Sequence, residues 1–375
     1  MRIAINTRFL LKGKMEGFGW FTYETVKRIV QQHPEHTFFF FFDRAYDQKY
    51  IFSDNVQPVI ISPPARHPIL FKIWFDYSVT RALKKHKIDL FFSPDGFLSL
   101  KTTIPQIGVI HDINFEHYPN DLPKAPLKYL KNYFPQFAKK AEHLLTVSEF
   151  SKQDIVKTYG IDPAKITVAH NGASDLFVPI EKSQQEIIRN KYTKGKPYFI
   201  FVGALHPRKN LNRLMEAFNQ FKTETNSDTQ LLIVGEKLWK NKPFQTHLDS
   251  LAHKNSVHFS GHVKLETLTA LMGSARALTF VSYFEGFGIP LVEAMQAGTP
   301  ILCGNKTSLP EVVGNAALLV DPFSVKAISD GLIEIDKNKD LRANLKQKGF
   351  ERAKLFNWNF TADKIWNVLD KALKK

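Results

Sequence analysis

Two glutamates in the second half of the sequence flank a short glycine-containing stretch. Glu285 and Glu293 stand eight residues apart and follow the apolar run Ala277–Val281. Glycines such as Gly286 and Gly288 allow a tight turn and a close approach of the backbone to a ligand. Pro290 suits the first position of a following helix, and the N-terminus of a helix favours a phosphate.

Carboxylates repel phosphate, so Glu285 and Glu293 are expected to accept hydrogen bonds from hydroxyl groups. A phosphate flanked by sugar and ribose hydroxyls describes a nucleotide sugar. Taken singly, the two glutamates have a plainer explanation: Glu293 stabilises a helix N-terminus, and Glu285 is a solvated loop residue.

A basic turn provides a second candidate site. The strand-like run Tyr198–Val202 is followed by Gly203, a turn with Arg208 and Lys209, and an amphipathic helix. Paired cations at this position can bind a diphosphate and neutralise the charge that develops as it leaves. A solvated basic turn is the alternative. Asn210 is interpreted as a helix N-cap rather than as a ligand contact.

These patterns together resemble the glutamate-x7-glutamate signature and the diphosphate loop of retaining GT-B glycosyltransferases, in particular glycosyltransferase family 4 (glycosyl transferases group 1). Gly17-Phe18-Gly19 is similar to the N-terminal glycine loop of this family, His111 to its active-site histidine, and Gly261-His262-Val263 to its nucleobase turn. The N-terminal glycine run is shorter than is usual in the family.

The resemblance implies a role for each matching residue. It implies catalytic roles for His111, Glu285, Arg208 and Lys209. It implies donor contacts for Gly17, Gly19, Gly203, Val263, Gly286, Phe287, Gly288, Ile289, Pro290, Leu291 and Glu293.

No metal or other cofactor is expected. The Asp-x-Asp tripeptide with which GT-A transferases hold a divalent metal is absent from the sequence. Arg208, Lys209 and a helix N-terminus would supply the same electrostatic stabilisation.

The elements that position these residues can be read from periodicity. Short strands that are apolar throughout alternate with helical segments, a pattern typical of parallel sheets covered on both faces. In the helix after the basic turn, one apolar stripe is formed by Leu211, Leu214, Met215, Phe218 and Phe221.

We therefore predict an α/β protein with two Rossmann-like, doubly wound domains that face each other across a cleft, as in GT-B. The N-terminal, acceptor-side domain is expected over residues 1–178, and the nucleotide-sugar-binding domain over residues 179–358. A C-terminal helix over 359–375 is expected to return to the first domain, by analogy with GT-B proteins.

Composition limits the possible partners. The formal net charge is +15, spread over both halves, which suits a nucleic acid, an anionic membrane or a phosphorylated small molecule. The one cysteine, Cys303, excludes an internal disulfide and fits a reducing compartment. No signal peptide or spanning segment is recognised, so a cytoplasmic location is expected.

Two basic segments bear on membrane binding. Residues 66–87 and 123–140 interleave cations with aromatic residues such as Trp74 and Tyr77. Such faces suit the inner, anionic surface of a membrane. Ordinary amphipathic helices with buried aromatic faces are the alternative.

The predicted function is a retaining transfer of a hexose from GDP-mannose or a UDP-sugar to a glycan or lipid-linked acceptor, in cell-surface polysaccharide assembly. Two alternatives remain: a nucleotide-sugar epimerase of the GT-B fold, and a non-enzymatic protein that uses its basic surface to bind nucleic acid or membrane. The absence of an RNA-recognition motif speaks against nucleic acid.

Overall fold

The computed structural model describes residues 1–13, 15, 17–235 and 242–374. The chain divides into two compact units. The first comprises Met1–Asn171 and Asn357–Lys375, and the second comprises Gly172–Phe356. The sequence placed the division near 178 and 358.

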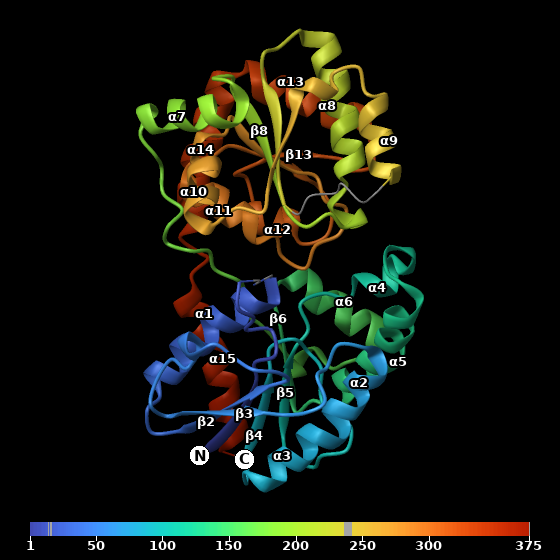
Figure 1. The fold of residues 1–375 in the computed structure, drawn as a ribbon, viewed down its shortest axis with the longest axis vertical. Coiled ribbons are helices and arrows are strands. Elements are labelled where there is room, and N and C mark those ends of the chain that lie inside the picture. The colour runs from blue at the N-terminus through green and yellow to red at the C-terminus, as the bar shows by residue number, and fades with distance from the viewer. Residues whose placement is uncertain (14, 16, 236–241, 375) are drawn as a thin grey trace. The chain divides into compact units, whose positions relative to one another are not determined.

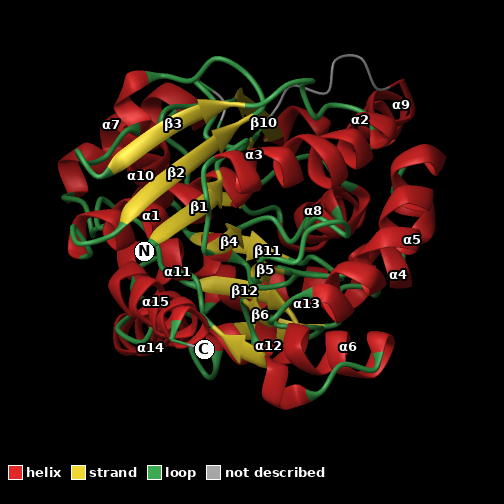
Figure 2. Ribbon diagram, turned by 90° about the horizontal axis from the view of Figure 1, so that it is seen from below, coloured by secondary structure: helices red, strands yellow, loops and turns green. Residues whose placement is uncertain are grey.

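The first unit is built on a seven-stranded parallel sheet in the order β3-β2-β1-β4-β5-β6-β7 (Figure 2). Its central strands are buried because the runs that form them are apolar on both faces. The strands are β1 (Arg2–Asn6), β2 (Thr37–Phe42), β3 (Val56–Ile60), β4 (Leu90–Ser93), β5 (Gln106–Val109), β6 (His143–Thr146) and β7 (Ile166–Val168).

The helices of the first unit pack against this sheet. They are α1 (Gly17–Gln32), α2 (Pro68–Ile73), α3 (Thr80–Lys85), α4 (Asn114–His117), α5 (Lys124–Lys140), α6 (Glu149–Tyr159) and α15 (Trp358–Leu373), with a π-helical turn, Trp74–Val79, between α2 and α3.

The last helix belongs to the first unit, and Figure 1 shows α15 beside α1. Arg28 Nε donates a 2.7 Å hydrogen bond to Asn359 Oδ1, and the ring of His33 stacks on Trp366 with centroids 3.6 Å apart. The sequence placed Phe360 on the apolar side of this helix, but its side chain is exposed, and Trp358 is buried instead. Residue 375 lies outside the described residues.

The second unit contains a six-stranded parallel sheet in the order β10-β9-β8-β11-β12-β13. Its strands are β8 (Tyr198–Val202), β9 (Gln230–Val234), β10 (Val257–Gly261), β11 (Ala277–Phe280), β12 (Ile301–Gly304) and β13 (Leu318–Val320). The five apolar residues predicted to form a stripe on the helix after β8 are all buried, which confirms that prediction.

The helices of the second unit connect these strands. They are α7 (Lys182–Thr193), α8 (Leu211–Thr225), α9 (Lys242–Ser250), α10 (Leu265–Ser274), α11 (Ile289–Ala297), α12 (Leu309–Val313), α13 (Val325–Lys337) and α14 (Lys339–Ala353). Among the described residues, no helix combines the length and the apolar character needed to cross a bilayer.

Candidate functional site

Three charged side chains meet at the carboxyl ends of β8 and β11. Arg208 and Lys209 lie in a 3-10 turn after β8, and Glu285 follows β11. Arg208 Nη1 lies 2.6 Å from Glu285 Oε2, and Lys209 Nζ lies 2.6 Å from Oε1. The two cations therefore converge on one carboxylate. The sequence had predicted only hydrogen bonds from hydroxyl groups to Glu285, and not these ion pairs.

Backbone hydrogen bonds hold this cluster together. Arg208 also donates from Nη1 to the Phe284 carbonyl at 3.0 Å, while its own carbonyl accepts from the Tyr283 amide at 3.0 Å. The amide of Glu285 donates to Thr307 Oγ1, and Ser308 Oγ donates to the Glu285 carbonyl. Hydrogen bonds therefore hold the backbone of Glu285, and ion pairs hold its carboxylate.

The charge of Glu285 is set by these contacts. Burial alone would raise its pKa, but the adjacent Arg208 and Lys209 outweigh that effect and hold the pKa at about 2. Glu285 is therefore ionised at neutral pH. With two cations and one anion, the cluster keeps one net positive charge to offer to a phosphate.

Glu293 has the opposite electrostatic environment. The sequence had suggested that Glu293 lies at the start of α11, but it lies in the second turn. No described residue forms a hydrogen bond with its carboxyl. Burial raises its pKa to about 8. The unliganded site therefore holds Glu293 mostly protonated at neutral pH, able both to donate to and to accept from a hydroxyl group.

The glycine turn before α11 positions the helix N-terminus. Gly288 caps α11 with φ +100°, a backbone conformation that strains other residues, and an added Cβ would lie 3.0 Å from Leu291 and 3.3 Å from Phe280. The helix ends at Gly298 in the left-handed conformation, as predicted. Gly286 and Phe287 precede the Gly288 cap, and Ile289 and Pro290 form the first turn of α11.

Two further glycines meet beside the basic turn. A Cβ at Gly235 would lie 2.3 Å from the carbonyl oxygen of Gly203, so the chain can pass here only without a side chain. A cavity of about 630 Å³ opens next to this turn, and its lining includes His206, Asn210 and Tyr283.

Asn210 occupies the N-cap position of α8, as predicted, but its side chain does not cap the helix. Its φ is +63°, and Nδ2 donates instead to the carbonyls of Val281 at 3.0 Å and Pro322 at 2.6 Å. The left-handed backbone turns the side chain away from the free amides. Asn210 therefore ties the basic turn to the end of the neighbouring strand.

His111 follows β5 in the first unit. Its Nε2 lies 2.8 Å from the Pro94 carbonyl, which can only accept, so Nε2 carries the hydrogen and Nδ1 keeps its lone pair. The rings of Phe18 and Phe21 pack edge-on at 4.8 and 4.7 Å. Burial lowers the pKa of the imidazole, and the hydrogen bond to Pro94 only partly offsets it. His111 is thus a neutral, oriented imidazole.

Gly17 and Gly19 form the first turn of α1 rather than a loop. An added Cβ at Gly19 would lie 2.8 Å from the Phe9 carbonyl, whereas nothing lies within 4 Å of one at Gly17. The glycine motif therefore lies at a helix N-terminus. At Gly19 a larger residue would collide with the carbonyl of Phe9, so only a glycine permits this packing.

The candidate residues fall into two groups. Ion pairs and backbone bonds bring Arg208, Lys209 and Glu285 together in the second unit, where Val263 lies on the loop between β10 and α10. His111, Gly17 and Gly19 lie in the first unit.

Sequence reasoning missed Thr307 and Ser308, whose hydroxyl groups form hydrogen bonds with the backbone of Glu285. A pair of hydroxyl residues shortly after an apolar strand could have marked them.

Among the described residues there is no cluster of three His, Cys, Asp or Glu side chains that could hold a metal ion. Cys303 is buried, and burial raises the pKa of its thiol, so it remains protonated at neutral pH.

Two family models match successive parts of the chain. Residues 15–175 match "Glycosyltransferase Family 4", and residues 183–352 match "Glycosyl transferases group 1". Among curated proteins, the chain is 29% identical over 278 residues to an O-antigen chain mannosyltransferase B of Escherichia coli, covering 74% of this chain and 73% of that one. It is also 29% identical to the O-antigen chain mannosyltransferase RfbU of Salmonella typhimurium, with 72% of each chain covered.

Solved structures share the fold. Anabaena HepE in complex with UDP and glucose superposes with a TM-score of 0.77 at 17% identity, covering 99% of this chain and all of that one. WaaG, a glycosyltransferase involved in lipopolysaccharide biosynthesis, gives a TM-score of 0.77 at 16% identity, with 98% and 99% covered. The predicted fold class, two parallel α/β units of the GT-B type, is confirmed.

Proposed function

We propose, from the premise that the chain belongs to glycosyltransferase family 4, that it transfers a hexose from GDP-mannose or a UDP-sugar to a glycan or lipid-linked acceptor. Mannose is the first candidate because the relatives reported above are O-antigen mannosyltransferases. The assembly of a cell-surface polysaccharide is the corresponding process.

One observation carries the proposal: Arg208 and Lys209 converge on Glu285 between β8 and β11. The order of the second sheet reverses at this pair of strands, and ligands of open α/β sheets bind outside the carboxyl ends of the strands at such a switch point. Arg208, Lys209 and the amides at the start of α11 are assigned to the donor diphosphate.

The two cations stabilise the transition state as the diphosphate leaves. Charge accumulates on the leaving oxygen while the glycosidic bond breaks, and preorganised cations lower the barrier because they need no reorientation. Glu285 holds both cations in place before the donor arrives. Glu293 is assigned to the ribose hydroxyls, which donate hydrogen bonds to its carboxyl.

We assign retention of anomeric configuration to the transfer. An inverting enzyme needs a general base opposite the leaving group, and Glu285 is already committed to two cations beside the diphosphate site. The acceptor would instead attack on the face from which the diphosphate leaves, and a diphosphate oxygen would take its proton. Neutral His111 is assigned to a hydroxyl of the donor sugar or of the acceptor.

The transfer is proposed to need no metal and no other cofactor, because Arg208, Lys209 and α11 supply the positive charge. Assays with and without millimolar EDTA test this. Unchanged rates are expected, and complete loss of activity that manganese or magnesium restores would contradict the assignment.

A cytoplasmic location at an anionic membrane face is proposed from the first unit. The rings of Trp74 and Phe75 are buried, so they do not face a membrane, but Ile69 is 68% exposed and Tyr77 60% exposed. Exposed apolar and aromatic side chains next to Lys72 suit the interface of an anionic bilayer.

A donor screen tests the central proposal. The full chain is incubated with GDP-mannose, GDP-fucose, UDP-glucose, UDP-galactose and UDP-N-acetylglucosamine, with and without mannose-terminated acceptors. Release of the nucleoside diphosphate that rises with acceptor is expected for one donor class. Absence of hydrolysis and of thermal stabilisation by GDP and by UDP would overturn the proposal.

A further inference from the structure

The first sheet has a switch point of its own. Its strand order reverses between β1 and β4, because β2 and β3 lie on one side of β1 and β4 to β7 on the other. In open parallel sheets this crevice, outside the carboxyl ends of the two strands, is where ligands bind. In the second unit, the equivalent position holds the cluster of Arg208, Lys209 and Glu285.

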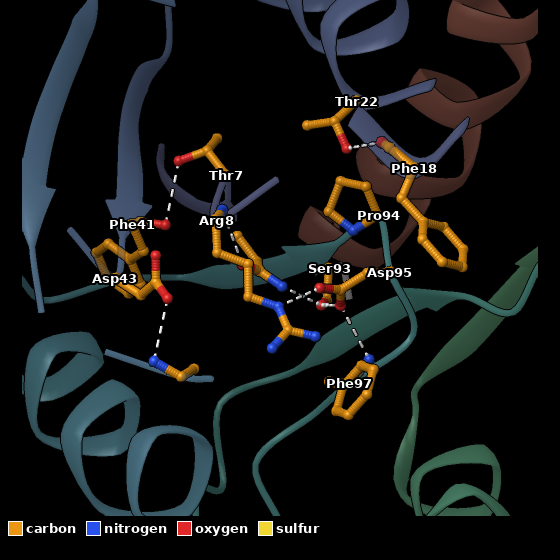
Figure 3. Close-up of polar contacts among 12 residues, drawn as sticks. Thr7, Arg8, Phe18, Thr22, Phe41, Asp43, Ser93, Pro94, Asp95 and Phe97 are labelled. Carbon is orange, nitrogen blue, oxygen red and sulfur yellow. Dashed lines mark hydrogen bonds and ion pairs between the residues drawn. The ribbon is translucent and has the colours of Figure 1, made fainter. Parts of the chain in front are cut away.

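A buried ion pair occupies this position in the first unit (Figure 3). Arg8 follows β1 and Asp95 follows β4, and Arg8 Nε lies 2.6 Å from Asp95 Oδ2. The other carboxylate oxygen, Oδ1, accepts from Ser93 Oγ at 3.0 Å and from the Phe97 amide at 3.1 Å. Asp95 therefore accepts three hydrogen bonds and holds Arg8 by one nitrogen only.

The two terminal nitrogens of Arg8 have no hydrogen-bond partner among the described residues, although the side chain is only 5% exposed. Neither nitrogen is sealed from solvent. Figure 3 shows that the guanidinium is joined to Asp95 through Nε, with no dashed line from the terminal nitrogens. The guanidinium lies 4.4 Å from the centroid of Phe97 and 4.8 Å from that of Phe9, and both rings are half-buried. Such rings hold the cation in place and leave its N–H donors available to a ligand.

Two more polar groups nearby lack partners. Tyr129 on α5 is 7% exposed, and its hydroxyl forms no hydrogen bond with any described residue. Asp76 accepts from the Leu100 amide at 2.8 Å through Oδ1, while no described group bonds to Oδ2. The ring of Tyr129 packs on Phe71 and Phe97 with centroids 5.5 and 6.0 Å apart. Arg8 and Tyr129 therefore contact the same two rings, those of Phe71 and Phe97.

The charges of Asp76 and Arg8 both act on the hydroxyl of Tyr129. Burial raises the pKa of Tyr129, the charge of Asp76 raises it further, and Arg8 opposes both effects. The phenol is neutral at physiological pH. A neutral hydroxyl, a carboxylate oxygen and a guanidinium fork thus have no hydrogen-bond partner among the described residues, although each belongs to a largely buried side chain and still reaches solvent. All three are therefore open to a ligand.

We propose that Arg8, Asp76 and Tyr129, with the rings of Phe9 and Phe97, bind a hydroxylated sugar ring of the acceptor; this subsite rests on the proposed glycosyltransferase function. Sugar hydroxyls accept from Arg8 and donate to Asp76, and the C–H faces of the ring pack on the aromatic rings. A phosphate fits worse, because Asp95 already neutralises the charge of Arg8 and the carboxylate of Asp76 would repel an anion.

The subsite is joined to His111 by one short segment. Pro94, whose carbonyl accepts from His111 Nε2, is the residue directly before Asp95. Asn6 Nδ2 also donates to Ser93 Oγ at 3.0 Å, which fixes the start of this segment. A sugar held by Arg8 therefore lies next to the segment that orients the imidazole.

The test separates acceptor binding from donor binding. Tyr129→Phe removes one hydroxyl and keeps the ring, Arg8→Lys keeps the charge but loses the fork, and Tyr133→Phe, one helical turn away, is the matched control. For the acceptor found in the donor screen, Tyr129→Phe and Arg8→Lys are expected to raise KM about tenfold. The donor KM and donor hydrolysis without acceptor should stay within about twofold, as should all values for Tyr133→Phe. Unchanged acceptor KM in Tyr129→Phe would overturn the proposal even if Arg8→Lys fails to fold.

A binding measurement without nucleotide tests the subsite independently of the proposed transfer activity. Saturation-transfer NMR with methyl α-mannoside and with inorganic phosphate, without nucleotide, is run on the natural protein and on Tyr129→Phe. Saccharide binding that weakens in Tyr129→Phe supports the subsite even if no nucleotide sugar is turned over. Phosphate binding that displaces the saccharide, or no binding of either probe, would overturn it.

Discussion

The ammonium of Lys209 lies 2.6 Å from Oε1 of Glu285, so the cation assigned to the donor diphosphate is already paired before any donor binds. Arg208 shares the same carboxylate. The charges of the site are therefore fixed in position before the donor arrives. When the donor binds, the cations exchange one anionic partner, the carboxylate, for another, the diphosphate.

Lys209→Ala should slow transfer by roughly 30- to 1,000-fold, which corresponds to about 2–4 kcal/mol of transition-state stabilisation. Steady-state rates under saturating donor measure it. Lys326→Ala is the matched control because Lys326 is exposed and pairs with Asp330, one helical turn away. A rate for Lys209→Ala within about twofold of the parent would exclude the role.

Glu285→Gln should uncouple nucleotide binding from turnover. Removing the carboxylate leaves Arg208 and Lys209 without their anionic partner, so GDP or UDP should bind at least as tightly as before. Transfer should fall, because the cations lose their fixed position. Calorimetry with the nucleotide and the transfer assay measure the two effects. Weaker nucleotide binding at an unchanged melting temperature would speak against this arrangement.

Donor affinity should rise with pH up to about 8 and then level off, because burial raises the pKa of Glu293 to about 8 in the unliganded site. Ribose hydroxyls that donate to the carboxylate favour its ionised form, so binding below pH 8 releases a proton. Calorimetry in buffers of different ionisation enthalpy detects that proton. Glu293→Gln should remove the pH dependence, and a dependence that persists in this variant would assign it to another group.

The same group affects stability with a definite sign. The folded-state pKa of Glu293, about 8, lies above its ordinary value of 4.5, so its contribution to stability is complete below 4.5 and lost as pH rises towards 8. Glu293→Gln should therefore raise the melting temperature more at pH 8.5 than at pH 5. Equal shifts at both pH values would show that the carboxyl is not desolvated.

Retention predicts that the product has the anomeric configuration of the donor. The proton NMR spectrum of the product decides this, because the coupling at the anomeric carbon of the new glycosidic bond reports its configuration. The opposite anomer would refute attack on the leaving-group face, even if Arg208, Lys209 and Glu293 all bind the donor as assigned.

The fold was largely predictable because its signals are local. Runs such as Phe38–Phe42 are apolar on both faces and became buried strands, and the stripe on α8 has helical spacing. The position of Glu293 in the second turn of α11 was not predictable, because one residue of uncertainty in a helix start moves a side chain by 100°.

The site was predictable where a motif marks it and not elsewhere. Arg208, Lys209 and Glu285 were found through spacing and resemblance, but their mutual ion pairs depend on strands far apart in sequence. Arg8 and Asp95 are 87 positions apart, and neither lies in a pattern that suggests binding. Only the strand order, with β1 beside β4, brings them together.

The position of α15 has a consequence for biosynthesis. The face of α1 that packs on α15, including Phe21 against Trp358 at 6.1 Å, is completed by a segment that the ribosome adds only after the whole of the second unit. The second unit is contiguous and can fold while the chain is still growing, whereas the first unit stays open until translation reaches residue 357 and beyond. Chains cut short before that point would expose apolar surface to chaperones and proteases, so the first unit completes its folding only after α15 has been synthesised.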